Sequence, residues 1–400
     1  MKVLVISHMY PSAFNEIAGI FVHEQVKALI NKGIEVQVVS PIPWTPFPIN
    51  CLSSKWKKYS AVPEKTVYDG IIIWYPRYVT FPRAWFFASS GQRMYLGIKE
   101  IVKKIYQEFQ FDLIHAHVAL PDGFAAMMLS EICNRPFIVT VHGQDLYITI
   151  NRNKGCKTAL NNVFKKADQI ITVSSKLKKI AINNIGYNHK IIVIGNGVPL
   201  NKIITKESNI VYRNNTNRKT ILSVSYLINR KGIDYNLRAF AKLIDKYSNL
   251  KYQIIGDGPE KNRLKKLAAD LGINRQVEFL GRLAHKEALK YMAKADIFSL
   301  PSWNEGFGVV YIEAMVQGKP VIGCRGEGIE DFVEDGKTGM LIEPKDVDSL
   351  VQTIDYLLSN PDEAWAIGKQ ARKFVLENYT WDKNAEKTIK VYKEVLKNVC

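Results

Sequence analysis

The strongest constraint on the fold is an alternation of short β-branched apolar runs with helical stretches along the whole chain. In the first half the runs are Val3–Ile6, Val36–Val39, Ile71–Tyr75, Leu113–Ala116, Phe137–Val141, Ile170–Val173 and Ile191–Ile194. In the second half they are Ile221–Val224, Tyr252–Ile255, Val277–Leu280, Ile297–Leu300, Pro320–Ile322 and Met340–Ile342. Nearly continuous hydrophobicity is typical of parallel strands buried on both faces. The pattern therefore predicts an α/β protein with two doubly wound, Rossmann-like parallel sheets.

The length of 400 residues suits two domains, because a single core rarely grows to that size. A polar stretch without periodicity at 200–217 predicts the boundary, with domains at 1–200 and 201–380. From about Trp381 to Cys400 we expect a helix that packs back on the first domain. Paired Rossmann-like domains commonly bind their ligand where the strands end, so we also expect an interdomain cleft.

The composition is that of a globular protein, with 47% hydrophobic and 23% charged residues. No apolar run approaches the roughly 18 residues that span a bilayer. The first apolar run, Lys2–Ile6, is too short for the core of a signal peptide, so we expect a cytoplasmic protein. Its five cysteines are scattered without metal-ligand spacing, which indicates reduced thiols.

The net charge of +17 is unevenly distributed. Residues 151–220 hold fourteen Lys or Arg against only two acidic residues, Asp168 and Glu207. Such a field attracts an anionic partner: a nucleotide, a nucleic acid, an anionic lipid or an acidic polymer. We find no recognised nucleic-acid module and no stacking platform, so nucleic acid is not an expected partner.

Residues 41–95 differ from the rest because they are rich in Pro, Trp, Phe and Tyr, and basic residues accompany the rings. Aromatic rings among basic residues suit a membrane interface, where amphipathic rings lie at the level of the lipid headgroups. The same rings would equally serve as core. The sequence leaves both interpretations open.

The clearest chemical signal is the stretch from Glu305 through Gly306, Phe307, Gly308 and Val309 to Glu313, directly after an apolar run and at the start of a helical pattern. The glycines leave the backbone bare, so a ligand can approach closely. Unpaired N–H groups at a helix start favour phosphate. A glutamate on such a helix can accept hydrogen bonds from vicinal hydroxyls, such as those of a ribose. The stretch therefore predicts a site for a phosphate group and for vicinal hydroxyls such as those of a ribose.

The stretch Ser299–Gly318 resembles the E-x7-E signature of retaining family-4 glycosyltransferases of the GT-B fold. The resemblance covers essentially the whole chain and is greatest to cell-surface polysaccharide members, including the teichuronic-acid biosynthesis type. Other matching motifs are Ala18–Val22 after Tyr10-Pro11, His142–Asp145, Asn196–Val198, Arg230–Gly232, Gly256–Pro259 and Gly326–Glu330. The resemblance implies an acceptor-side N-terminal domain and a donor-nucleotide-binding C-terminal domain.

The resemblance also implies a role for each matching residue. Glu305, His142 and Lys231 would be catalytic: Glu305 and His142 would contact the donor sugar, and Lys231 would neutralise the departing diphosphate. Donor-binding residues would be Gly19, Arg230, Lys231, Arg282, Gly306, Phe307, Gly308, Val309 and Glu313. Tyr226 stands where the family often has an arginine, so Arg230 is the candidate for the missing cation.

We expect no obligatory metal and no cofactor besides the nucleotide-sugar substrate. Asp346-Val347-Asp348 spells a D-x-D motif, but it opens an amphipathic segment and is typical of helix capping. No cluster of His, Cys or Asp shows metal-ligand spacing in the sequence.

The expected reaction transfers a sugar, with retention, from a nucleoside diphosphate to a hydroxyl of a glycan or lipid-linked acceptor. The resemblance alone favours UDP. The aromatic and basic N-terminal half adds the expectation of peripheral contact with an anionic membrane, at the inner face of the plasma membrane. Three alternatives remain: a GT-B-fold sugar-nucleotide epimerase, a non-catalytic sugar-nucleotide-binding protein and, suggested by the charge alone, a nucleic-acid-binding protein.

Overall fold

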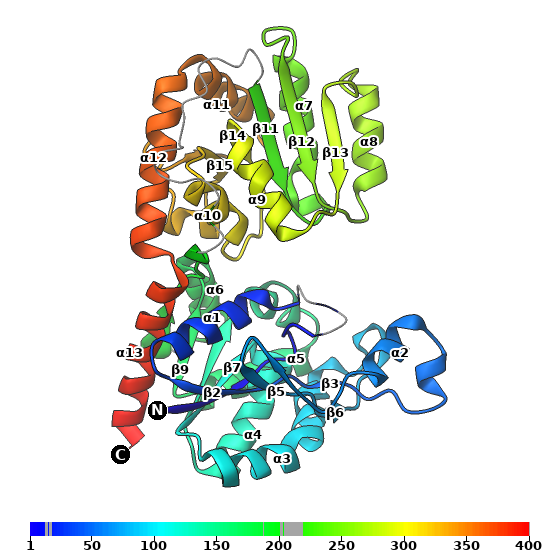
Figure 1. The fold of residues 1–400 in the computed structure, drawn as a ribbon, viewed down its shortest axis with the longest axis vertical. Helices are drawn as coiled ribbons and strands as arrows, with labels where there is room; N and C mark the ends of the chain where they lie inside the picture. Colours follow the sequence, from blue (N-terminus) through cyan, green and yellow to red (C-terminus); the bar gives the residue numbers. More distant parts are fainter. Residues whose placement is uncertain (13–14, 16–17, 187, 201–202, 204–218, 400) are drawn as a thin grey trace. The chain divides into compact units, whose positions relative to one another are not determined.

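The computed structural model describes residues 1–12, 15, 18–186, 188–200, 203 and 219–399. The chain divides into two compact units, one of Met1–Asn196 with Trp381–Cys400 and one of Gly197–Thr380 (Figure 1). The break that the sequence predicts at 200–217 lies outside the described residues, apart from residues 200 and 203. We call the two parts the N-terminal unit and the second unit.

The N-terminal unit is built on an eight-stranded sheet in the order β10-β9-β8-β7-β1-β2-β5-β4. The strands are β1 (Lys2–Ile6), β2 (Glu35–Val39), β4 (Lys65–Tyr68), β5 (Ile71–Trp74), β7 (Leu113–His117), β8 (Phe137–Val141), β9 (Gln169–Thr172) and β10 (Ile191–Val193). Neighbouring strands are parallel except β4, which pairs antiparallel with β5 and which the sequence did not predict. The predicted parallel sheet is confirmed, with an antiparallel edge as a correction.

Helices of the N-terminal unit bury the apolar strands. They are α1 (Ile20–Asn31), α2 (Ser54–Ser60), α3 (Ser90–Phe109), α4 (Phe124–Cys133), α5 (Lys154–Lys166), α6 (Ser175–Ile185) and α13 (Trp381–Val399). The last of these, α13, shares a core with the first strand, since Trp381, Ala385 and Tyr392 lie in the same buried cluster as Val3 and Val5. The side-chain amide of Gln25 on α1 donates to Oδ1 of Asn384 on α13 at 2.7 Å.

The second unit holds a six-stranded parallel sheet in the order β13-β12-β11-β14-β15-β16. The strands are β11 (Lys219–Val224), β12 (Leu250–Ile255), β13 (Val277–Gly281), β14 (Ile297–Ser299), β15 (Val321–Cys324) and β16 (Met340–Ile342). Its helices are α7 (Ile233–Leu243), α8 (Lys261–Asp270), α9 (His285–Lys294), α10 (Val309–Val316), α11 (Val347–Ser359) and α12 (Pro361–Asn378). The strand order reverses between β11 and β14, so ligands are expected at their carboxyl ends.

The aromatic segment at 41–95 contributes some rings to the core and exposes others. Trp74, Tyr75 and Tyr78 are buried, whereas Trp44 and Phe86 are 54% and 70% exposed. A two-stranded parallel sheet of β3 (Ile42–Pro43) and β6 (Arg77–Tyr78) organises the segment. Among the described residues, no helix is both long and apolar enough to cross a membrane.

Candidate active site

Two loops meet where the strand order of the second unit reverses. After β11, a short 3-10 turn at Asn229–Lys231 ends at Gly232, whose φ is 68°. A Cβ on Gly232 would lie 2.2 Å from the carbonyl oxygen of Pro301, so only glycine allows the loop after β14 to pack this closely. Arg230 joins the loops, because its carbonyl accepts from the Trp303 amide and its guanidinium donates to the Asn304 carbonyl, both at 2.9 Å.

This packing places the ammonium of Lys231 on the carboxylate of Glu305, to which Nζ donates a hydrogen bond. The two side chains are only 14% and 13% exposed. Burial alone would raise the pKa of Glu305, but the charge and hydrogen bond of Lys231, with smaller contributions from Arg230 and Ser302, lower that pKa below its ordinary value. Glu305 is therefore an ionised acceptor held beside a cation.

The backbone around Glu305 is fixed by a third loop. The Glu305 amide donates to Oε2 of Glu327 at 2.8 Å, and the Gly328 amide donates to the Glu305 carbonyl at 3.3 Å. A Cβ on Gly328 would lie 2.4 Å from the carbonyl oxygen of Gly306, so the loops touch through bare backbone. The sequence marked Gly326–Glu330 only as a matching motif. Its structural role is to hold the loop that carries Glu305.

The N-terminus of α10 opens directly after this loop. Gly308 adopts φ 90° at the N-cap and makes no side-chain cap, so the first amides of the helix are not bound by a capping side chain. Beneath it, the buried Tyr311 hydroxyl lies 2.9 Å from Ser302 Oγ. The buried ring of Phe307 packs on Phe332 with centroids 5.1 Å apart, so the ring is part of the core of the second unit. Helix-start amides without a capping side chain are able to bind an anion.

Glu313, one turn further along α10, is 14% exposed, and its carboxylate accepts a hydrogen bond at 2.6 Å from Nε2 of His285. The sequence reasoning missed His285, because the two residues are separated along the chain and no local pattern joins them. Arg282 is exposed just after β13 and lies close enough to Asp257 to contribute to its lowered pKa, behind the larger effects of the Gly258 amide and Lys261. Tyr226 is 62% exposed and carries no charge.

The predicted residues of the N-terminal unit, Gly19 and His142, lie in the loops that follow β1 and β8. Gly19, with φ 62°, begins α1, and a Cβ there would lie 2.0 Å from the carbonyl oxygen of Met9. One residue into the helix, the Phe21 ring contacts the His142 ring at 4.6 Å. His142 Nε2 lies 3.0 Å from His117 Nδ1. Burial lowers the pKa of His142 to about 3, so its imidazole is neutral at physiological pH.

Two further histidines and two carboxylates lie on β7 or in the loops near His142 and His117. His115 is fully buried and bonds Tyr392 of α13 and Thr140, each at 2.7 Å, which assigns it a packing role. His8 pairs with the buried Asp122 at 2.7 Å. Asp145 accepts from the Ala119 amide at 2.8 Å, and burial raises its pKa to about 6. The loops after β1, β7 and β8 thus gather several protonatable groups in one place.

The D-x-D motif lies elsewhere in the second unit. Asp346 is the N-cap of α11, and its carboxylate accepts from the amides of Asp348 and Ser349, each at 3.0 Å. Asp348 pairs with Lys242 of α7. The predicted capping role is confirmed.

The comparisons with known proteins agree with this geometry. The model for glycosyltransferase family 4 matches residues 18–202, and the model for glycosyl transferases group 1 matches residues 204–374. A Bacillus subtilis protein named for teichuronic acid biosynthesis, the glycosyltransferase TuaC, is 28% identical over 88% of each chain. An uncharacterized glycosyltransferase of Methanocaldococcus jannaschii is 31% identical over 74% of this chain and 79% of its own. Among solved structures, Anabaena HepE in complex with UDP and glucose superposes with a TM-score of 0.71 at 20% identity, covering 98% of this chain and 100% of that one.

The two doubly wound α/β units, each built on a mainly parallel sheet, define the class of the fold, and the family models match both halves of the chain. The chain belongs to the family-4 glycosyltransferases of the GT-B fold and is a glycosyltransferase.

Proposed function

We propose that the enzyme transfers a sugar, with retention of the anomeric configuration, from a UDP-sugar to a hydroxyl of a glycan or lipid-linked acceptor in cell-surface polysaccharide synthesis. The observation that carries the proposal is the buried Lys231–Glu305 pair beside the start of α10. The likeness to a protein named for teichuronic acid biosynthesis supports a polysaccharide acceptor. The structural likeness to Anabaena HepE, which was solved in complex with UDP and glucose, supports a UDP-sugar as the donor.

In this proposal Lys231 stabilises the departing diphosphate. When the bond from the sugar to the diphosphate breaks, negative charge grows on the phosphate oxygen, and a fixed cation aimed there lowers the barrier. The helix-start amides at Val309 and Val310 would bind the same diphosphate. Arg230 adds a nearby positive charge and would replace the cation that the side chain of Tyr226 does not supply.

In this proposal Glu305 binds the donor sugar. Its lowered pKa keeps it ionised, so it accepts hydrogen bonds from sugar hydroxyls and stabilises positive charge on the ring. Each such bond to a charged acceptor contributes about 1.5–3 kcal/mol. Because Lys231 and Ser302 already engage its carboxylate, Glu305 is a poor nucleophile.

Retention then follows from attack on the face from which the diphosphate leaves. The acceptor oxygen bonds to the anomeric carbon as the carbon–oxygen bond to the diphosphate breaks. A phosphate oxygen of the departing nucleotide takes the acceptor proton. The neutral His142 would hydrogen-bond the donor sugar, Glu313 would hold the ribose hydroxyls, and Arg282 would lie by the nucleobase. No step in this scheme requires an obligatory metal.

The acceptor side brings the membrane into the proposal. Lipid-linked acceptors lie at a bilayer surface, and the N-terminal unit exposes Trp44, Trp85 and Phe86 in a segment rich in basic residues. Amphipathic rings beside cations suit the headgroup region of an anionic membrane. We therefore propose that the enzyme makes peripheral contact with the inner face of the plasma membrane.

A donor panel tests the proposal. The full chain is incubated with UDP-, GDP- and ADP-sugars, with and without lipid-linked acceptors, and released nucleotide and new glycoside are measured. Acceptor-dependent release that Glu305→Gln and Lys231→Met abolish is the expected result. Glu287→Gln and Lys290→Met, which remove an exposed pair of the same kind in α9, are matched controls that keep activity. Binding without release would favour a non-catalytic binding protein, and release of an isomerised sugar would favour an epimerase.

A further inference from the structure

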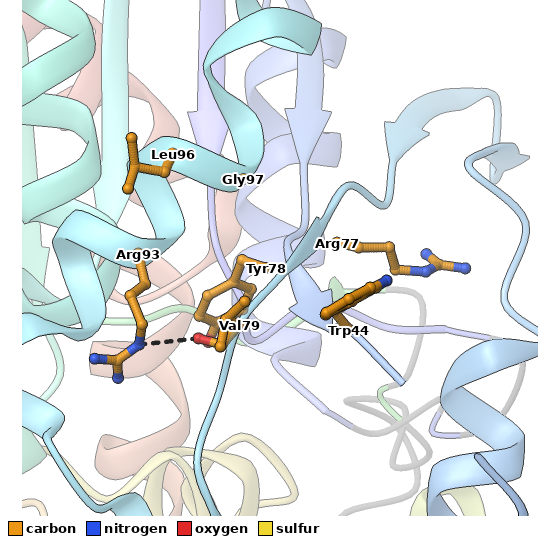
Figure 2. A pocket seen from close by; sticks show the side chains of 7 residues that line it. All are labelled: Trp44, Arg77, Tyr78, Val79, Arg93, Leu96 and Gly97. Carbon is orange, nitrogen blue, oxygen red and sulfur yellow. Dashed lines mark hydrogen bonds between the residues drawn. The ribbon is translucent and has the colours of Figure 1, made fainter. Parts of the chain in front are cut away.

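A cavity of about 420 Å³ lies in the N-terminal unit, where α3 packs on the two-stranded sheet of β3 and β6 (Figure 2). It is lined by Trp44, Arg77, Tyr78, Val79, Arg93, Leu96 and Gly97. A Cβ on Gly97 would lie 2.5 Å from the Arg77 carbonyl oxygen, so glycine is what lets helix and strand approach this closely. None of these residues is assigned to the reaction above.

The walls of the cavity are apolar and face water. Trp44 is 54% exposed, Leu96 is 56% exposed and Val79 is 42% exposed. A folded monomer gains nothing from presenting three large apolar side chains together around a hollow, and such patches mark interaction sites.

Two guanidinium groups flank the apolar walls. In Figure 2, Arg77 lies with Trp44 on one side of Tyr78 and Val79, and Arg93 lies with Leu96 on the other. Arg77 donates to the carbonyls of Tyr75, at 2.6 Å, and Val62. Arg93 donates to the Val79 carbonyl at 3.0 Å, to Ser89 Oγ at 2.6 Å and, from both terminal nitrogens, to the Phe86 carbonyl at 3.2 Å. Within the part of the chain that the structure describes, no carboxylate lies within 4.0 Å of either guanidinium. Of the five N–H groups of a guanidinium, Arg77 therefore retains three and Arg93 one for an external anion, and both keep their positive charge unpaired by a carboxylate.

The surrounding sequence is mainly basic. Residues 36–99 contain two acidic residues, Glu64 and Asp69, of which Glu64 interacts electrostatically with Arg77. The cations of this stretch are Lys55, Lys57, Lys58, Lys65, Arg77, Arg83, Arg93 and Lys99. Aromatic rings lie next to these cations. The Arg93 guanidinium lies 4.9 Å from the centroid of the Phe81 ring, and the ring centroids of Phe81 and Phe86 are 5.5 Å apart. An acidic protein surface would match the charge but not the exposed apolar walls, whereas an anionic bilayer matches both.

We propose that the surface around this cavity docks on an anionic phospholipid bilayer. Trp44, Val79 and Leu96 enter the boundary between headgroups and acyl chains, and the cavity takes the apolar part of a lipid. Arg77 and Arg93 each contact a headgroup phosphate. The inference rests on the membrane contact of the proposed function and deepens it, because it names the residues and the lipid chemistry.

Co-sedimentation with vesicles tests the surface without donor or acceptor. The full chain is mixed with phosphatidylcholine vesicles that contain or lack phosphatidylglycerol. We expect binding only with the anionic lipid, and about fivefold weaker partitioning for each arginine removed, so about 25-fold for Arg77→Gln with Arg93→Gln. Arg238→Gln with Arg275→Gln removes the same net charge from exposed positions of the second unit and is expected to stay within about twofold of the unmodified chain.

A second variant tests the apolar wall. Leu96→Asp is expected to weaken binding strongly, whereas Ile132→Asp, at a 46% exposed position on α4, is the matched control and binds normally. Thermal unfolding of every variant shows that it is folded. Phosphate and chloride at equal ionic strength are expected to release the protein equally from vesicles.

The outcomes separate this surface from the rest of the proposal. If the unmodified chain ignores anionic vesicles, the membrane contact and this surface both fail, while sugar transfer to a soluble acceptor still tests the chemistry. If it binds but the arginine and Leu96 variants bind like their controls, this surface alone fails. Preferential release by inorganic phosphate would also overturn the inference, because it would indicate a site for free phosphate.

Discussion

The Lys231–Glu305 pair predicts that stability and activity respond in opposite ways to a second substitution. Lys231→Met keeps most of the side-chain volume but leaves the carboxylate of Glu305, 13% exposed, without its cation. Breaking a buried pair in this way costs up to about 3–5 kcal/mol of unfolding free energy. Glu305→Gln in the same chain removes the unpaired charge. The double variant should therefore recover much of the stability that the single variant loses.

Activity should not recover. If Lys231 stabilises charge on the departing diphosphate, its loss lowers kcat by about 10²–10³, the usual cost of removing one fixed electrostatic group. Adding Glu305→Gln removes a second group that acts on the same transition state. The double variant should therefore be as slow as the slower single variant or slower still.

Two measurements on the same preparations decide the matter. Thermal unfolding gives the change in stability, and nucleotide release at saturating donor and acceptor gives kcat. The exposed Glu287–Lys290 pair provides the control, because removing such a pair changes stability by no more than about 1 kcal/mol. The reasoning is refuted if the double variant regains kcat to within about tenfold of the unmodified enzyme, since Lys231 would then act only by holding Glu305.

Four further predictions follow from the same structure. Because the pKa of His142 is lowered to about 3 in the folded chain, the unfolded chain binds the extra proton as the pH falls below roughly 6.5, and this residue should then remove about 1 kcal/mol of stability per pH unit. Asp145, with its pKa raised to about 6, acts in the opposite direction, because its contribution to folding stability is lost as the pH rises through that value. The test is therefore the difference in unfolding free energy between the unmodified chain and His142→Asn as the pH is lowered, since Asp145 is present in both. Asp346→Ala should cost about 1 kcal/mol in thermal unfolding and leave kcat unchanged, and a loss of turnover would contradict the capping role. Gly308→Ala should raise the KM for the donor, because the new Cβ would lie 2.5 Å from the Tyr311 ring and shift the helix start, and an unchanged KM would argue against phosphate binding there. Dialysis against EDTA should leave nucleotide release unchanged, and recovery of lost activity by added metal would disprove the metal-independent scheme.

Much of the fold was predictable because parallel strands leave a continuous apolar signal. Each of the predicted runs corresponds to a strand of one of the two large sheets. The missed strands are those without such a signal. β4 is a mostly exposed edge strand, and β3 and β6 are two residues each, with a proline in β3. Short or exposed strands depend on their neighbours for pairing, so the local sequence does not mark them.

The candidate site was predictable as a set of motifs and not as a set of contacts. Lys231 and Glu305 were each named, yet their hydrogen bond joins residues 74 positions apart. The contacts of His285 with Glu313 and of Glu327 with the Glu305 amide were not foreseen. Such contacts depend on which strands become neighbours at the switch point, and that order is a property of the whole sheet.

Helix α13 has a consequence for how the chain is made. Its residues Trp381, Ala385 and Tyr392 complete a core that also holds Val3, at the opposite end of the sequence. During synthesis the second unit, which is continuous from Gly197 to Thr380, emerges whole before the N-terminal unit receives its last helix. The half that is made first is therefore finished last, and until then the apolar face that awaits α13 is open to chaperones or to a second nascent chain.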